Sequence, residues 1–152
     1  METRLSWSET HLESSLDRRF LNYFTSQVAN CLTLPGPVAR TWANIVPALA
    51  LSTDNLHLFH ALLAVSAAYR VSQCPLDFDS LDQSNIHYGH CLSILRTLDL
   101  NGPETSATGT LAAIMLLCWH EVYHIFGITY IILGSLSAQR KSCARSALFS
   151  LS

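Results

Sequence analysis

Hydrophobic residues dominate the stretch from Trp42 to Tyr69, which contains no Lys, Arg or Glu and a single Asp. From Leu56 onward its side chains form two apolar stripes at helical spacing, with small residues between them: Leu58, Leu62, Val65 and Tyr69; Phe59, Leu63 and Ser66; Ala61, Ala64, Ala67 and Ala68. A helix that is apolar nearly all round is a buried helix. The pattern therefore predicts a central buried helix, whose first free N–H groups are capped by the side-chain oxygens of Ser52, Thr53 and Asp54.

Two helical segments are predicted before this helix. The first starts at Ser14, repeats an apolar residue every four positions (Leu16, Phe20, Phe24 and Val28), and ends at Pro35-Gly36-Pro37. The second is a shorter apolar segment from Trp42 to Leu51, in which Pro47 either bends the helix or starts a new turn.

Two more helices are predicted after it. One runs from about Ser80 to Leu98, with Leu81, Tyr88, Cys91, Leu92, Leu95 and Leu98 on one face, and stops at Asn101-Gly102-Pro103. The other runs from Thr110 to His124, with a core stripe of Leu111, Ile114, Leu117, Cys118 and Val122. Residues 125–141 are rich in β-branched side chains, so their propensity wavers between strand and helix. No segment alternates regularly, and the chain is predicted to be an all-α, irregular multi-helix bundle.

Composition adds that this bundle has little polar surface. Apolar residues make up 49% of the 152 residues and charged residues only 13%, against roughly a quarter in ordinary soluble domains. Such a chain is either deeply packed or covered by something larger. The net charge of −2, with nine scattered Lys and Arg, argues against direct nucleic-acid binding, which needs clustered cations.

Neither the cysteines nor the ends indicate a special compartment. The five cysteines are widely spaced with no C-x-x-C, so free thiols are expected, and the polar start METRLSWSETHLE does not resemble a signal peptide. The stretch from Leu111 to Gly134 is long enough to span a membrane. However, His120, Glu121 and His124 near its middle make that costly, so no membrane segment is predicted.

Several of these segments resemble one known family. The central stretch, with Trp42, Pro47, Leu49, Ala50, Leu58, Ala61, Leu62, Leu63, Ala64, Ser66 and Ala67, is similar to the start of the fungal-specific transcription factor regulatory domain. The resemblance extends over about residues 16–140 through FLNYFTSQVA, through His87-Tyr88 with Leu92, Leu95 and Arg96, through LLC followed by Glu121-Val122, and through Leu133-Gly134-Ser135.

The resemblance implies a non-enzymatic, all-α regulator that acts in the nucleus of a fungus and transmits a signal to a DNA-binding head of six cysteines around two zinc ions. That head is absent here, and the family's domain is normally longer. The chain is therefore divided into a flexible lead-in (1–13), a partial regulatory domain (14–140) and an irregular tail (141–152), and is expected to be an incomplete part of a larger helical domain. Its partners would be other parts of the regulator or the transcription machinery. A helical interaction scaffold without a regulatory role is an alternative.

A second alternative comes from His120-Glu121-Val122-Tyr123-His124, an H-E-x-x-H match. On a helix such residues bind zinc and supply a general base, as in metallopeptidases, and Gly127 fits the longer H-E-x-x-H-x-x-G form. No His, Asp or Glu follows from Ile125 to Ser152, so a third ligand would have to come from upstream, from His87, His90 or Asp99. The proposed core stripe would also leave His120 and His124 to one side of the buried face. A chance match is the favoured interpretation.

Two further pairs, His57 with His60 and His87 with His90, have the i, i+3 spacing from which helical bundles build metal sites. Those sites also use Glu, and none lies between Glu13 and Glu104, so these histidines are expected at polar edges of packed helices. Accordingly the sequence predicts no catalytic residue, no cofactor and no metal ligand.

Overall fold

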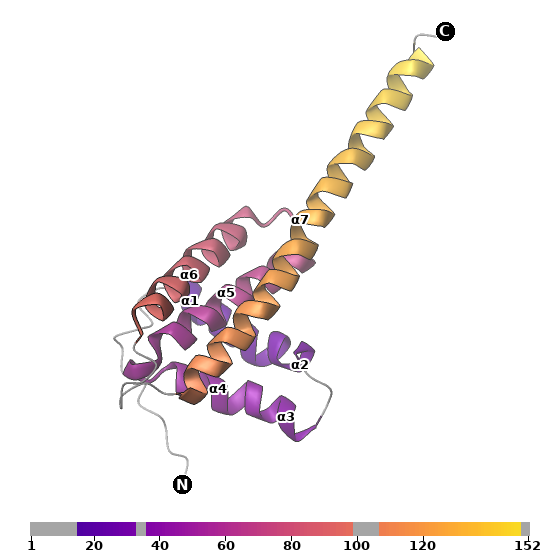
Figure 1. Cartoon of the computed structure of the whole chain (residues 1–152). Coiled ribbons are helices and arrows are strands. Elements are labelled where there is room, and N and C mark those ends of the chain that lie inside the picture. The colour runs from indigo at the N-terminus through magenta and orange to yellow at the C-terminus, as the bar shows by residue number, and fades with distance from the viewer. Residues whose placement is uncertain (1–14, 33–35, 99–106, 150–152) are drawn as a thin grey trace.

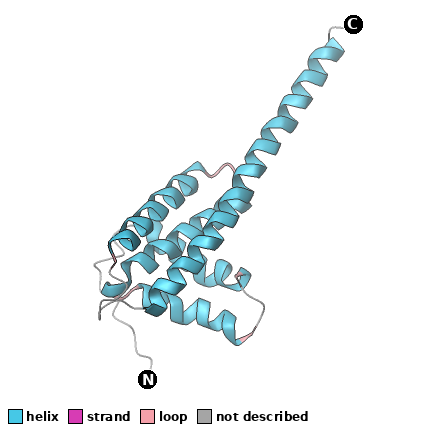
Figure 2. Cartoon of the chain, viewed as in Figure 1, coloured by secondary structure: helices cyan, strands magenta, loops and turns pink. Residues whose placement is uncertain are grey.

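The computed structural model describes residues 15–32, 36–98 and 107–149, with side chains described through Ala138. Its first helical segment comprises α1 (Ser15–Tyr23), a π-helical turn (Phe24–Val28) and α2 (Ala29–Cys31). The second comprises α3 (Pro37–Arg40), a π-helical turn (Thr41–Ile45) and α4 (Val46–Ala50). A 3₁₀ turn (Thr53–Asn55) precedes α5 (Leu56–Gln73), α6 (Phe78–Thr97) and α7 (Ala107–Phe149). The described residues contain no strand (Figure 2), which confirms the all-α prediction.

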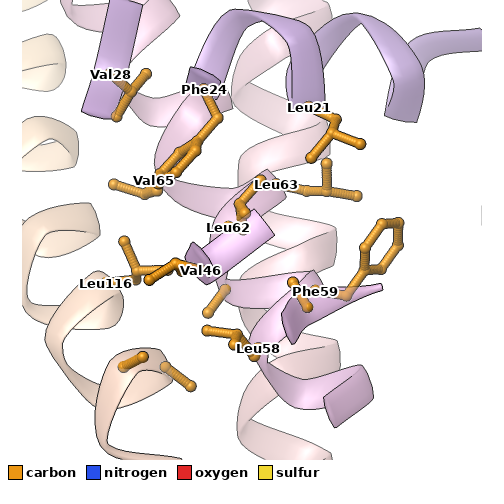
Figure 3. Packing of buried hydrophobic residues seen from close by; sticks show 14 of the residues in the cluster. Leu21, Phe24, Val28, Val46, Leu58, Phe59, Leu62, Leu63, Val65 and Leu116 are labelled. Atoms are coloured by element: carbon orange, nitrogen blue, oxygen red, sulfur yellow. The ribbon is translucent and has the colours of Figure 1, made fainter. Parts of the chain in front are cut away.

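Helix α5 is the centre of this bundle. It packs against α6 and α7 along its length and against α1 and α4 on its other faces (Figure 1), and no side chain from Leu56 to Arg70 is exposed. Figure 3 shows side chains from neighbouring helices directed at α5, among them Leu21, Val46 and Leu116. Each fully buried leucine contributes about 1.5–3 kcal/mol relative to an exposed one. The predicted central helix is confirmed.

The chain reaches α5 through a helix that Pro47 does not break. The residues before this proline form the π-helical turn, in which the N–H of Val46 bonds the carbonyl of Thr41 instead of an i−4 partner. A π turn holds one extra residue, which relieves the crowding between a proline ring and the preceding turn. The break comes later, where the chain turns by 106° between residues 37–50 and 53–73.

The start of α5 lies where predicted, but its expected side-chain caps are wrong. The hydroxyl of Ser52 donates to the carbonyl of Leu49 at 2.8 Å, and Asn55 Nδ2 donates to Ser52 Oγ at 2.8 Å. These bonds close the end of α4 and stabilise the turn, and neither Ser52 nor Asn55 caps the following N–H groups. In contrast, α6 is capped by a residue outside the predicted range, because the Asp77 carboxylate accepts the N–H of Ser80 at 3.1 Å.

The predicted core stripe of α7 is also wrong. Leu111 is 60% exposed, Ile114 is 47% exposed, and Cys118 and Val122 are exposed as well; only Leu117 of the predicted set is buried. The buried face is Ala112, Ala113, Leu116, Leu117 and His120. Because this helix is apolar on nearly every side, its periodicity does not select a face. The small alanines let α7 lie close to α5, and that approach selects the buried side.

Beyond the bundle, α7 continues as a single helix (Figure 1). Residues 125–141, for which strand and helix competed, are helical, and the tail expected to be irregular is helical to Phe149. Extending a formed helix adds one hydrogen bond for each residue ordered, so modest propensity suffices once the bundle holds its start. Residues 107–138 have the length and hydropathy to cross a membrane. Residues 37–73 meet the same criteria only when the two helices on either side of the 106° bend are taken together, and the second of these is the buried α5.

Gly127 lies at a close approach of α7 to α5. A Cβ added there would lie 3.0 Å from Cγ1 of Val71, whereas one added at Gly134 would meet nothing within 4 Å. The glycine of the extended H-E-x-x-H-x-x-G pattern therefore has a packing role in this fold.

We expect Gly127→Gln to destabilise the chain by about 1–3 kcal/mol, because the side chain must displace α7 from α5. The same substitution at Gly134 is the matched control and should be neutral or stabilise by up to about 1 kcal/mol through helix propensity. Urea unfolding followed by circular dichroism measures both. Equal stabilities of the two variants would contradict the close approach.

Candidate functional site

A row of buried polar side chains lies where α6 meets α5 and α7. Ser80, Ser84 and His87 occupy one face of α6 and are buried, as are His57 of α5 and His120 of α7. The sequence predicted a different, apolar face for α6. Of the residues on that predicted face, only Cys91 is fully buried, and Leu81, Tyr88, Leu92, Leu95 and Leu98 are half-buried. The interface is therefore polar along its middle.

Ser84 connects all three helices. Its hydroxyl donates to the carbonyl of Ala64 in α5 at 3.2 Å and lies 2.8 Å from Nε2 of His120. The single hydroxyl proton of Ser84 is donated to the carbonyl of Ala64. In the contact between Ser84 and His120, the donor must therefore be the Nε2–H of His120. That leaves Nδ1 of His120 as the unprotonated nitrogen, and it has no hydrogen-bond partner. The imidazole is thus held neutral in one tautomer.

Burial lowers the pKa of His120 to about 4; the neighbouring His124 acts in the same direction, and Glu121 opposes it. The side chain is only 2% exposed, so a proton on Nδ1 would place a charge where neither water nor a protein acceptor compensates it. His120 is therefore part of the core, not of its edge.

The H-E-x-x-H residues do not converge on a metal position. The rings of His120 and His124 stack at 5.5 Å between centroids and 18° between planes, and Tyr88 stacks on His120 at 4.5 Å. Glu121 is exposed and hydrogen-bonds Tyr88, which raises the pKa of that phenol to about 12. Within the described residues no third His, Cys, Asp or Glu joins this pair, and Asp99 lies outside them. The arrangement stacks ring faces and gives a zinc ion too few ligands.

The other histidine pairs do come together. His60 of α5 lies beside His87 and His90 of α6, with one ligand nitrogen of each within 4.8 Å of the others. The Nδ1 atoms of His60 and His87 are 3.0 Å apart, and Nε2 of His87 is 3.4 Å from Oδ1 of Asp17 in α1. Burial lowers the pKa of His87 and raises that of Asp17, while their mutual attraction opposes both shifts.

The expectation that these histidines lie at polar edges is therefore wrong for two of them. His87 is buried within this cluster, and His57 is buried against Thr110, whose hydroxyl lies 3.3 Å from Nε2 of His57. Spacing along each helix could reveal the pairs, but not which pairs from different helices would meet.

The described cysteines do not form a metal-binding or catalytic site. Cys31, Cys74, Cys91 and Cys118 are free, as predicted. Only Cys91 is buried, and burial raises its pKa to about 12, so the thiolate that binds metals or attacks substrates is disfavoured there.

One cavity lies between α1 and the start of α6. Its volume is about 240 Å³, and an ion pair of Arg70 Nε with Asp77 Oδ2 at 3.2 Å lies in its lining, together with Tyr23 and Asp79. Ligand pockets are generally larger, about 300–1,000 Å³, and mostly apolar. The ion pair here also serves the fold, because Asp77 caps α6.

Comparison with known families identifies the bundle that carries these residues. A sequence model of the fungal specific transcription factor domain matches residues 19–125. The chain belongs to this family. The match includes the whole of α5 and α6 and ends in α7 at Ile125, two residues before Gly127, which lies against α5. No curated protein and no solved structure matches the chain.

In this fungal specific transcription factor domain, His120 should make stability depend on pH. In the unfolded chain it takes up a proton near its ordinary pKa of 6.5, but in the fold only near pH 4. The stabilisation is complete above pH 6.5 and is lost as pH falls toward 4, since the unfolded state binds more protons in that window. The difference between the pKa values of His120 in the unfolded and folded states corresponds to about 3 kcal/mol of the free energy of unfolding.

We expect His120→Gln to flatten this dependence, because the amide can donate to Ser84 but does not titrate. His57 and His87, whose pKa values are also lowered, will leave part of the slope. Urea unfolding above pH 6.5 and near pH 4 measures the effect, with His90→Gln, at an exposed position, as the control. A slope unchanged in His120→Gln would show that the pKa of His120 is not lowered in the fold.

Proposed function

We propose that this chain is the regulatory, non-DNA-contacting part of a fungal zinc-cluster transcription factor that acts in the nucleus. Its membership of the fungal specific transcription factor domain family carries the proposal. The five cysteines lack the close spacing of a six-cysteine zinc cluster, so DNA contact is assigned to another part of the regulator.

The distribution of charge supports a role away from DNA. The described arginines with resolved side chains are Arg18 and Arg19 of α1 and one each at the ends of α3, α5 and α6. Arg70 is already paired with Asp77. Binding along a phosphate backbone needs several cations on one face, and the arginine side chains that the structure describes are spread over α1, α3, α5 and α6.

The exposed face of α7 supports a partner within the regulator. On either side of Gly127 this helix presents large apolar side chains to solvent, including Ile125 (61% exposed), Phe126 (62%), Ile132 and Leu133. Apolar patches of this kind are sites of association. We assign this face to other helices of the same regulatory protein, which would give α7 a cover like the one α5 has inside the bundle.

A hydrolase function receives less support. The metallopeptidase alternative needs zinc on His120 and His124, whose rings stack, and His120 Nε2 already bonds Ser84. The family is one of transcription factors, and the proposal is accordingly for a protein without catalytic activity.

The regulatory role is tested by fusing the chain to an unrelated DNA-binding head and measuring a reporter gene in a fungal host. We expect transcription to change several-fold relative to the head alone, and the effect to be lost in Leu62→Asp, which places a charge in the core. The chain without a head should not shift labelled duplex DNA. A reporter that does not respond, or a sequence-specific shift that weakens with salt, would contradict the proposal.

The partner face is tested by replacing Ile125, Phe126 and Leu133 with Gln. We expect the isolated wild-type chain to self-associate and the triple variant to move toward monomer, as measured by light scattering after gel filtration. The control is Leu76→Gln with Phe78→Gln, which removes exposed apolar surface at the α5–α6 turn. A monodisperse wild-type monomer would contradict a docking role, and partition of the wild type into neutral phospholipid vesicles would indicate a membrane segment instead.

A further inference from the structure

We propose that His60, His87 and His90 form a binding site for a divalent transition metal, with zinc as the ion that fits best. Neither the family match nor the sequence motifs assign a metal to these residues. Two helices supply the three imidazoles, and α1 supplies a carboxylate behind one of them. This is the group of three candidate ligands that the described side chains bring together.

The spacing of the nitrogens suits a tetrahedral ion. Two ligands at 2.0–2.1 Å from zinc in tetrahedral directions are about 3.3 Å apart. The Nδ1 atoms of His60 and His87 are 3.0 Å apart, and all three candidate nitrogens lie within 4.8 Å of one another. Small rotations of the three imidazole rings would bring their nitrogens to this separation. His90 would have to move furthest, and its side chain is exposed and has room to do so.

Asp17 supplies the support that metal-binding histidines usually have. If Nδ1 of His87 faces the ion, its Nε2–H is on the other side of the ring, where Oδ1 of Asp17 lies at 3.4 Å, within ion-pair distance but without the geometry of a hydrogen bond. A carboxylate in this place fixes the tautomer and orientation of a ligand histidine and increases its basicity. Without an ion, the two close Nδ1 atoms share a proton in a hydrogen bond, which metal binding would replace.

The chemistry of the donors narrows the choice of ion. Three neutral imidazoles with no thiolate among them suit zinc, copper, nickel or iron rather than magnesium or calcium. A water molecule would complete a four-coordinate zinc site on the exposed side of His90.

A bound ion would connect three parts of the bundle. It would join α5 to α6 directly and α1 through Asp17. An ion that binds only the folded chain stabilises it according to its concentration relative to Kd, about 2.7 kcal/mol at a hundredfold excess over Kd. The proposal does not depend on the regulatory role, because it concerns binding by the folded bundle itself.

The test is equilibrium dialysis of the full chain against zinc, followed by metal analysis and a thermal melt. We expect one zinc per chain, a higher Tm with zinc, and a tetrahedral visible spectrum when cobalt replaces it. Asp17→Asn should weaken zinc binding about 10–100-fold, as loss of a supporting carboxylate does. His90→Ala should abolish stoichiometric binding while leaving the metal-free Tm nearly unchanged, since this side chain is exposed.

His124→Ala is the matched control, because it removes a histidine of the stacked pair and should retain both the zinc and the Tm shift. Absence of stoichiometric zinc in the parent chain would overturn the proposal. So would binding that survives His90→Ala but is lost in His124→Ala, which would move the site to the H-E-x-x-H residues.

Discussion

Burial of α5 on every side is the condition that the rest of the bundle has to meet. A helix without a polar face cannot lie at a surface, so α1, α4, α6 and α7 surround it. Its alanines admit close neighbours, and Gly127 of α7 uses that closeness against Val71. The widened turn before Pro47 keeps the preceding helix continuous, so that Val46 reaches the same core.

The neighbours of α5 bring polar groups with them, and these pair across the helix interfaces. Ser84 serves a backbone carbonyl of α5 and a ring nitrogen of α7, while His57 contacts Thr110. A buried polar group without a partner costs about 1–3 kcal/mol, so such pairs favour one alignment of the helices over others that bury equal apolar area. Among the described side chains, Oδ1 of Asn55, Nε2 of His87 and Nδ1 of His120 are buried without a hydrogen-bond partner, and the last of these underlies the expected sensitivity to acid.

Two surfaces remain on which the bundle can act. The cluster of His60, His87 and His90 lies where α5 meets α6 and has the chemistry of a metal site. The exposed apolar face of α7, which includes Ile125, Phe126 and Leu133, has the chemistry of a protein contact. Both involve helices that pack on α5, so an ion at one and a partner at the other would act on the same core helix. For the regulatory role proposed above, this arrangement would offer a physical connection between a bound ligand and a partner.

The sequence by itself determined the all-α class, the burial of α5 and the family, because these follow from local periodicity and residue order. It did not determine which side of α7 is buried, since a helix that is apolar all round offers several equivalent faces. It also did not determine which histidines meet. His60 lies 27 positions before His87 and Ser84 lies 36 before His120, and such pairs form only through the packing of α6 and α7 on α5. Tertiary structure decided these contacts because the choice of face and the relative placement of helices are properties of the packed core, not of any single segment.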